Sequence, residues 1–519
     1  MNFYKRLSQH YLFKNASITA TLSAAGAVSG LILDASIVSI FGVGYQTDAF
    51  FTALTLPLLL SSVFSIQCPK ILIPVFSEYF NRNQYTDAWL LLRNVVTTSF
   101  IGLAGIYLAG IVLSGIIVPL QIPGLESRTI ALAIWLSRIL FGLVLCQGLA
   151  SIMQSVLYAR HSYLISCSGK LVSNVVTIIF LVSSRGHFGI QAVAVGMLFG
   201  NAVQVGLLAL VLATHGFRYH WVLKPGDAKL REILVSFRYP LAGHILGESG
   251  MILQNVLGSF LGSGSVTVLR YGSRIVQAVA GILLGSVVQV TLPLIAKYAA
   301  ANDLRLQKRT LLESIQLLNL IGLPVCVWLV LTAKPLVVLF FQRGAFSAAD
   351  AALTALIIRF MVPDLLLGRI VSVTQTLFYA NLDLRTPLIS TIIYTAVNTT
   401  VAVVLLHFVG VVGIPLAVSL ASISNTIYMI SRLRSRFGSL GWAEMWGFTC
   451  RLVSTCVVGG GGFVVGTKLV TLTTVPYSLT KLLAVAMPTA FGMCVFIIGA
   501  LLFRLVDTRL LLPIGGRAS

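Results

Sequence analysis

Several charged side chains lie inside long apolar stretches of the sequence. On insertion scales, a charge at the centre of a membrane helix costs about 2.5–3.5 kcal/mol, so such residues need a partner or a water-filled cavity. They therefore predict a polar chamber within an apolar surround. In chain order they are Asp34, Asp48, Arg138, Lys170, His244, Glu248, Arg270, Arg274, Arg359, Asp364 and Arg369.

Arg270 and Arg274 are four residues apart, so they share one face of a helix. A guanidinium offers two parallel, charge-assisted hydrogen bonds to phosphate oxygens, which suits a phosphate or pyrophosphate ligand. Snorkelling to the membrane interface is the alternative for both arginines. His244 and Glu248 share a face in the same way, and Glu248 either neutralises Arg274 between conformations or forms a structural ion pair.

The sequence carries none of the common catalytic motifs. P-loop, Rossmann glycine, G-x-S-x-G and H-E-x-x-H patterns are absent, and the glycine run Gly459 to Gly462 lacks the lysine of a phosphate-cradling loop. Close helix packing is the expected use of that run. His215 and His220 lie on a polar linker and are not expected to bind a metal. We therefore expect a protein that is not an enzyme and needs no cofactor or metal.

The elements that must position these side chains are membrane helices. Of 519 residues, 57% are hydrophobic and only 10% are charged, and the mean hydropathy is +0.94. This composition excludes a water-soluble globule. The apolar runs predict an all-α polytopic protein of about fourteen spans. Their expected centres lie near residues 28, 57, 106, 143, 173, 200, 249, 282, 322, 365, 396, 421, 457 and 491.

The net charge is +21, and most of the basic residues lie in the connections between spans. This distribution is typical of membrane-topology signals and of contacts with anionic lipid rather than of nucleic-acid binding. Alternate connections hold 22 basic residues on one side and four on the other. An even number of spans then places both termini in the cytoplasm. The four residues on the outer side are Arg128, Arg185, Lys334 and Arg343.

Two halves of the sequence resemble each other. The segment 158–201 matches 379–425, with Asn174, Gly189 and Asn201 paired with Asn398, Gly413 and Asn425 at one offset. GVGYQT, from Gly42 to Thr47, likewise matches GSGSVT, from Gly262 to Thr267. A parallel repeat of six spans predicts two lobes around a central site that rock to expose it alternately. The expected domains are 1–214 (N-lobe), 215–235 (cytoplasmic linker), 236–431 (C-lobe) and 432–519 (two further spans and the C-terminus).

Four stretches of the sequence stand out as motifs: FGVGYQTDAFFTALTLP (Phe41–Pro57), LIPVFSEY (Leu72–Tyr79), LFFQRGAFSAAD (Leu339–Asp350) and FYANLDLRTP (Phe378–Pro387). They resemble the MurJ/MviN lipid II flippase family, within the multidrug/oligosaccharidyl-lipid/polysaccharide exporter superfamily. The resemblance covers nearly the whole chain, and its four motifs occur in the same order. It implies two lobes around a cationic central cavity, with the last two spans forming a groove for a lipid tail. It also implies a location in the bacterial inner membrane.

The resemblance carries individual residues over. Arg274 matches the arginine of span 8 and Asp48 the aspartate of the gate region, with Thr267 expected beside it. The family's two arginines of span 1 are replaced here by Ala27 and Leu33. The expected function is outward movement of an undecaprenyl-pyrophosphate-linked peptidoglycan precursor, lipid II or similar, by alternating access. Another prenyl-linked saccharide, or a drug or cation, is the alternative cargo.

The expected partners are the lipid-linked saccharide and the surrounding membrane lipids. Arg274 and Arg270 would contact the phosphates. Asp34 and Glu248 are assigned to the same binding site and leave room for proton or monovalent-cation coupling. The membrane potential alone would also drive a dianion outward. The protein is expected to act as a monomer.

Overall fold

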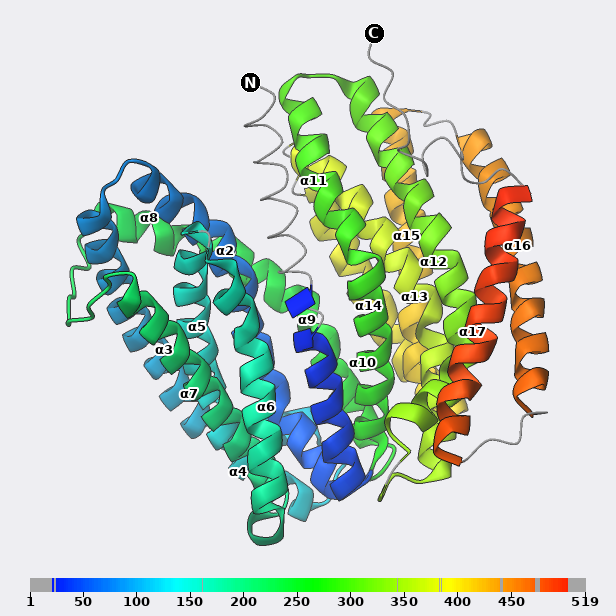
Figure 1. Ribbon diagram of the computed structural model, residues 1–519, viewed down its shortest axis with the longest axis horizontal. Coiled ribbons are helices and arrows are strands. Elements are labelled where there is room, and N and C mark those ends of the chain that lie inside the picture. Colours follow the sequence, from blue (N-terminus) through cyan, green and yellow to red (C-terminus); the bar gives the residue numbers. More distant parts are fainter. Residues whose placement is uncertain are drawn as a thin grey trace. The chain divides into compact units, whose positions relative to one another are not determined.

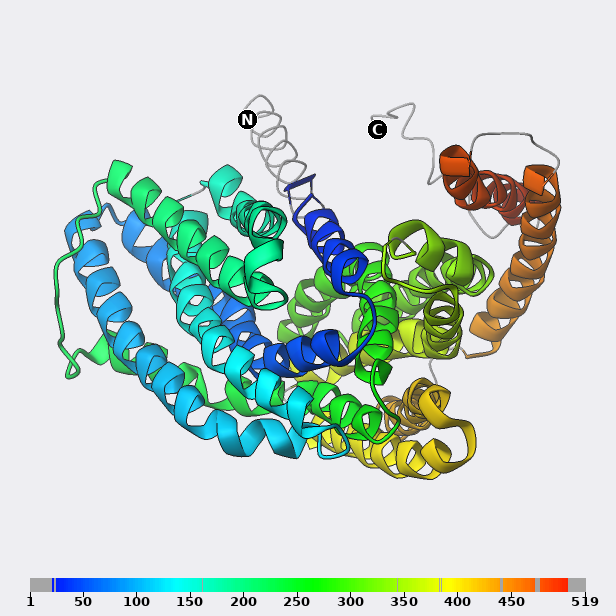
Figure 2. The same cartoon turned by 90° about the horizontal axis from the view of Figure 1, so that it is seen from below.

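The computed structural model describes residues 21–22, 25–160, 162–342, 344–381, 383, 385–438, 442–471 and 477–502, and within these ranges it contains helices and no strand. Figures 1 and 2 show helices packed side by side, coloured along the chain. The helices are Ala25–Phe41, α2 (Tyr45–Asn81), α3 (Tyr85–Gln121), α4 (Ser127–Leu140), α5 (Gly142–Ala159), α6 (Tyr163–Phe188), α7 (Gln191–Thr214), α8 (Ala228–Ser236), α9 (Arg238–Ser259), α10 (Ser265–Leu283), α11 (Gly285–Ala300), α12 (Leu304–Phe340), α13 (Ala348–Ala380), α14 (Arg385–Val409), η1 (Gly410–Val412), α15 (Gly413–Phe437), α16 (Trp442–Thr471) and α17 (Tyr477–Leu502).

Many of the described helices are long and apolar enough to cross a bilayer. Eight described helical stretches meet that criterion by length and composition. One of them, Arg385–Phe437, has 53 residues and contains two helices, and four shorter apolar helices accompany the eight. Every predicted span centre falls inside a described helix. The prediction of an all-α, polytopic membrane protein is therefore confirmed.

The chain forms two compact units. The first unit comprises Met1–Thr267 with Gly344–Phe346, and the second unit comprises Val268–Arg343 with Ser347–Ser519. In the first unit α2 packs against α4, α5 and α9, and α6 packs against α7. In the second unit α12 packs against α13, α14 against α15, and α16 against α17. The division into two lobes, a linker and a C-terminal pair of spans rests on sequence symmetry and stays a prediction.

One core cluster of the first unit lies around α2, α3 and α5. Phe76, Leu92 and Val156 are fully buried there, and Leu230 and Ile233 of the short helix α8 join the same cluster. Burying an apolar side chain of this size stabilises by about 1.5–3 kcal/mol relative to leaving it exposed. This packing fixes the linker helix α8 to the helices that it follows.

The internal repeat is visible in where helices begin. Helix α2 starts at Tyr45, the fourth residue of GVGYQT, and α10 starts at Ser265, the fourth residue of GSGSVT. Gly42 and Gly262 both have positive φ, +69° and +92°, a conformation that glycine adopts without steric cost. The two copies of the motif therefore share a local turn as well as a sequence.

Candidate functional site

The first copy of the repeated motif forms a tight entry to α2. The Gly44 N–H donates to Thr47 Oγ1 over 3.1 Å, and the Thr47 hydroxyl donates back to the Gly44 carbonyl over 3.0 Å. These bonds satisfy donors that the first turn of a helix leaves without partners. They hold the next residue, Asp48, in the first turn of α2.

Asp48 joins the two copies of the motif, and its side chain is fully buried. Its Oδ2 accepts the N–H of Gly264 at 2.5 Å. Its Oδ1 accepts the N–H of Thr267 at 2.9 Å and the hydroxyl of Thr267 at 2.6 Å. A carboxylate placed at the N-terminus of another helix caps that helix and interacts favourably with the positive end of its dipole. We call the set Asp48, Gly264 and Thr267 the loop lock.

A third segment adds to the same region of the first unit. The N–H of Ala345 donates to the Ser39 carbonyl over 3.1 Å. Gly344 has φ +58°, and a Cβ at this position would lie 2.0 Å from the oxygen of Ser39. A Cβ on Gly42 would lie 2.9 Å from Ala345. Only glycine permits this approach, so Gly344–Phe346 closes onto the end of helix Ala25–Phe41.

The loop lock is held by α9 on its other side. Asn255 Nδ2 donates to Thr55 Oγ1 over 2.8 Å, which ties the buried middle of α2 to α9. At the end of α9, the hydroxyl of Ser259 accepts the N–H of Gly124 over 3.2 Å. The segment that leads to Gly264 and Thr267 is thus fixed at its start.

Helix α10 carries the two arginines that the sequence singled out. Arg270 and Arg274 follow Thr267 by three and seven residues, which is about 4.5 and 10 Å along a helix axis. Both are half-buried and neither is without a partner. Tyr271 is fully buried, and its ring centroid lies 4.8 Å from that of Phe341. The contact between Tyr271 and Phe341 thus fixes the turn of α10 that lies between the two arginines.

The two carboxylates assigned to the substrate site lie in the first unit. Asp34 is half-buried in helix Ala25–Phe41 and has an interaction partner, and Glu248 is half-buried in α9. The side chain of His244 lies outside the described residues. Among the residues that the structure describes, no group of three or more His, Cys, Asp or Glu side chains could hold a metal ion.

Helices α12, α16 and α17 border an open apolar cavity of about 230 Å³ within the second unit. It is lined mainly by hydrocarbon, with Trp328, Phe463 and Phe496 among the lining residues. The indole N–H of Trp328 donates to Thr489 Oγ1 over 2.7 Å, so the cavity wall makes its own polar contact.

Close packing of α16 and α17 depends on glycine. A Cβ on Gly462 would lie 2.8 Å from Val495, and one on Gly459 would lie 3.2 Å from Phe496. Small residues allow membrane helices to approach closely. The predicted packing role of the glycine run is confirmed at these two positions, whereas Gly461 faces open space.

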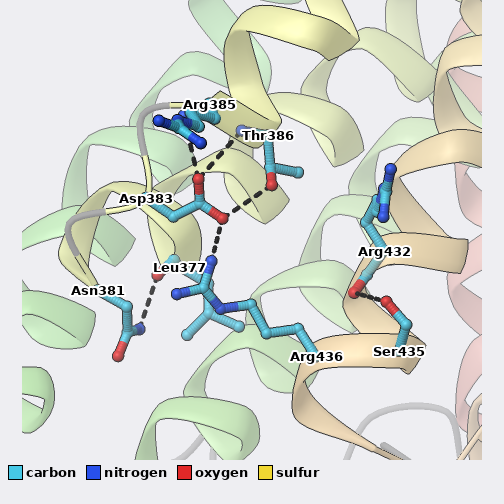
Figure 3. A network of polar contacts seen from close by, with 8 residues as sticks. All are labelled: Leu377, Asn381, Asp383, Arg385, Thr386, Arg432, Ser435 and Arg436. Carbon is cyan, nitrogen blue, oxygen red and sulfur yellow. Dashed lines mark hydrogen bonds and ion pairs between the residues drawn. The ribbon is translucent and has the colours of Figure 1, made fainter.

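A polar cluster forms in the second unit between α13 and α14, and Figure 3 shows it from close by. Asp383 accepts the N–H groups of Arg385 and Thr386 at 3.0 and 3.1 Å and the Thr386 hydroxyl at 2.8 Å. It also pairs with Arg436 of α15. Desolvation raises the pKa of Asp383, but the bonds from Thr386 and the charge of Arg436 outweigh it, so the pKa lies below its usual value.

The region of the loop lock contains residues that the sequence did not single out as functional. Gly344 and Ala345 lie within the LFFQRGAFSAAD stretch, and only their place in a motif distinguished them. Ser39, Asn255 and Ser259 carried no signal, because a lone serine or asparagine in an apolar run is common.

Comparison with known proteins matches this chain to one family. The sequence model described as "Lipid II flippase MurJ" matches residues 37–485. The "Probable lipid II flippase MurJ" of Buchnera aphidicola (strain APS) is 25% identical over 439 residues, covering 82% of this chain and 84% of the relative. The Vibrio cholerae protein of the same name is 23% identical, covering 80% and 81%.

Solved structures share the fold. A structure titled "Lipid II flippase MurJ, inward closed conformation" superposes with a TM-score of 0.75 at 20% identity, covering 94% of this chain and 98% of that chain. An inward-facing multidrug MATE transporter of the MOP superfamily gives a TM-score of 0.64 at 16% identity, covering 81% and 98%.

Proposed function

The chain belongs to the Lipid II flippase MurJ family, and on that premise we propose that it flips a lipid II-like molecule from the cytoplasmic to the outer leaflet. The observation that carries this proposal is the family match, which runs through nearly the whole chain. The protein is a transporter rather than an enzyme. It works by alternating access, a mechanism that its MATE-like fold supports.

The loop lock is the outer gate of this cycle. Asp48 holds Thr267 and Gly264 while the outer side is closed, and its three hydrogen bonds must break before the outer side opens. Because the bonds join the two copies of one repeat, a small rotation of either copy would separate them together. The gate thus has two discrete states.

Arg274 and Arg270 bind the phosphate groups of the headgroup. Their positions one turn apart on α10 match a pyrophosphate, whose two phosphorus centres each present oxygens to a guanidinium. The loop lock is hydrogen-bonded to the first turn of the same helix. A ligand that displaces α10 would therefore also strain the hydrogen bonds of the gate. Asp34 and Glu248, in the first unit, keep the substrate-binding role expected from the sequence and would supply carboxylates for proton or monovalent-cation coupling.

The prenyl tail stays in an apolar groove along α16 and α17. The cavity bordered by these helices and α12 offers about 230 Å³ of nearly pure hydrocarbon surface. Keeping the tail there avoids dragging it through a polar site, since burying a CH₂ group away from water is worth about 0.8 kcal/mol.

The membrane potential supplies a driving force without an ATP site. An inside-negative potential favours outward movement of a dianion by about 4–5 kcal/mol per 100 mV, at about 2.3 kcal/mol for each charge. Both termini lie in the cytoplasm, as the distribution of basic residues indicates. One chain contains both copies of the repeat, which supports a monomeric transporter.

A different prenyl-linked saccharide is a second candidate cargo. Leu33 and Ala27 stand where the family resemblance would place arginines, and Leu33 is only 5% exposed. A buried leucine cannot contact a phosphate, so the site has fewer cations than that resemblance implies. The loss of these charges favours a headgroup that needs fewer contacts with cationic side chains.

Native mass spectrometry of the purified protein with its co-purified lipids tests this assignment. We expect a bound species with the mass of a prenyl-pyrophosphate-linked saccharide, and the saccharide mass separates lipid II from another unit. Arg274→Ala should reduce this species about tenfold or more, because a charge-assisted hydrogen bond is worth about 1.5–3 kcal/mol. Arg359→Ala is the control, since Arg359 donates to the Val330 carbonyl over 3.1 Å. No enrichment of any prenyl phosphate in wild type would point to an exporter of drugs or cations.

A further inference from the structure

The segment between α7 and α8 runs along α3 instead of forming a free loop. In Figures 1 and 2 it is the extended green stretch at the left-hand edge that leads into α8. Phe217 is buried, and its ring centroid lies 5.6 Å from that of Trp89. Arg93 of α3 donates through Nε to the Arg218 carbonyl over 2.8 Å, and its Nη1 lies 3.0 Å from His220 Nε2.

Two further residues of α3 hold the same segment. The Asn94 amide donates to the Lys224 carbonyl over 3.0 Å and accepts the Lys224 N–H over 2.9 Å. Thr97 Oγ1 lies 3.2 Å from the Tyr219 hydroxyl. The bonds to Arg218 and Lys224 use backbone atoms, which leaves both side-chain charges available to other ligands.

The exposed apolar side chains of α3 indicate which part of the helix lies in the hydrocarbon core of the bilayer. They run from Phe100 to Leu120, apart from Tyr85 and Leu90 near the start of the helix, and Val112 is 75% exposed. Twenty residues of helix rise about 30 Å, which is the thickness of the hydrocarbon core. Thr97 and Arg93 lie three and seven residues beyond Phe100, or about 4.5 and 10 Å further along the axis. The segment that they hold is therefore at the level of lipid headgroups.

At that level the segment exposes aromatic and apolar side chains. Tyr219 is 50% exposed, Trp221 is 59% exposed and Leu223 is 47% exposed. Tryptophan and tyrosine are enriched at membrane interfaces, where their rings meet both hydrocarbon and polar groups. Three exposed residues of this kind, at alternate positions of one short segment, would be costly in water.

Basic side chains flank the aromatic ones, and the nearby acids are already engaged. Arg218 and Lys224 are exposed on either side of Trp221. Asp227 caps α8 by accepting the N–H groups of Lys229 and Leu230 at 2.8 and 3.1 Å. Glu232 pairs with Lys229 at 2.9 Å. Positive charge therefore remains on the exposed side of the segment.

We propose that residues 217–224, the interface segment, bind the headgroups of anionic phospholipids. Trp221, Tyr219 and Leu223 sit among the headgroups, and the Arg218 and Lys224 side chains bind lipid phosphate. Clusters of basic residues beside membrane helices attract anionic lipids in this way. The site is separate from that of the transported molecule, so it can fail while the proposed function stands.

Quenching of tryptophan fluorescence tests where Trp221 lies. The protein is reconstituted in vesicles of phosphatidylcholine with phosphatidylglycerol, and Trp221→Phe is subtracted from wild type to isolate one of six tryptophans. We expect a headgroup-linked nitroxide to quench this component at least twofold more than a nitroxide at the acyl-chain end. Strong quenching by aqueous acrylamide, or protection from every quencher, would overturn the proposal, since the residue would then face water or protein.

Lipid selectivity is tested with spin-labelled phosphatidylglycerol and phosphatidylcholine. The double variant Arg218→Gln/Lys224→Gln keeps the backbone bonds and should lower the preference for phosphatidylglycerol at least twofold. The control is Arg305→Gln/Lys308→Gln at the start of α12, which removes the same charge. These residues lie nine or more positions before Leu317, which is 44% exposed, or about 13 Å or more along the axis. Equal preferences in wild type and the double variant, or an equal loss in the control, would refute the site.

Discussion

Replacing Asp48 with asparagine is the sharpest perturbation of the proposed outer gate. The carboxylate accepts three hydrogen bonds, one from Gly264 and two from Thr267. An asparagine oxygen can still accept from Thr267, but its NH₂ group then faces the Gly264 N–H, donor against donor. The change keeps the shape of the side chain and removes its charge, so its effect is confined to these contacts.

The expected size of the effect follows from those bonds. A hydrogen bond to a charged group is worth about 1.5–3 kcal/mol, and a buried donor without a partner costs about 1–3 kcal/mol. Allowing for partial relaxation, Asp48→Asn should destabilise the outward-closed state by about 2–4 kcal/mol. At about 1.4 kcal/mol per factor of ten, the closed population should fall roughly 30- to 700-fold relative to the open one. Thr267→Val removes only the hydroxyl and should shift the equilibrium about tenfold.

Spin labels at Gln46 and Ser263 report this equilibrium, because each lies beside one partner of the loop lock. In wild type we expect one short distance between the labels. Asp48→Asn should add or substitute a longer distance and reduce lipid transport, while Thr267→Ser, which keeps the hydroxyl, should resemble wild type. An unchanged distance distribution with unchanged transport in Asp48→Asn would show that the lock does not hold the gate.

Three further changes probe other contacts. Gly344→Ala should abolish transport, because its Cβ would lie 2.0 Å from the Ser39 oxygen. The control is Gly410→Ala, which has a similar φ of +62° but no atom within 4 Å of the added Cβ. This variant should lose only stability and retain transport in the same assay. Arg160→Ala should lower the melting temperature by several degrees, since the guanidinium lies 5.3–5.5 Å from three aromatic ring centroids, contacts worth about 1–2 kcal/mol together; an unchanged melting temperature would contradict this. The lowered pKa of Asp383 in the folded state stabilises the protein above the unfolded pKa of about 3.9, and this stability is lost as the pH falls through the folded pKa. The melting temperature of Asp383→Asn should therefore depend less on pH between about 6 and 3 than that of wild type. Equal pH dependence in the two proteins would count against the interaction.

The fold was largely predictable because the thickness of the bilayer sets the length of the apolar runs in the sequence. A run of about 20 apolar residues is the length of one crossing, so each span centre fell inside a helix. The matched offset of GVGYQT and GSGSVT predicted an internal repeat, and a helix starts at the fourth residue of each copy, Tyr45 and Ser265. These features are local or periodic, and one sequence suffices to show them.

Contacts between distant segments were not predictable in the same way. Asp48 and Thr267 were expected in one gate because of the family resemblance, but the sequence did not show that the carboxylate caps α10. The Asn94 clamp on Lys224 joins residues 130 positions apart and leaves no periodic pattern. Such bonds depend on how packed helices align side chains, which hydropathy does not encode. The roles of Arg270 and Arg274 as phosphate ligands stay predictions.

Transport of labelled lipid II in vesicles containing the purified protein tests the central claim most directly. With an inside-negative potential, and with the lipid initially on the inner leaflet, we expect wild type to expose the headgroup to an enzyme added outside. Arg274→Ala should slow this exposure at least tenfold while Arg359→Ala leaves it unchanged. Exposure at the rate of protein-free vesicles, or an equal rate in wild type and Arg274→Ala, would contradict a flippase whose arginine holds the pyrophosphate.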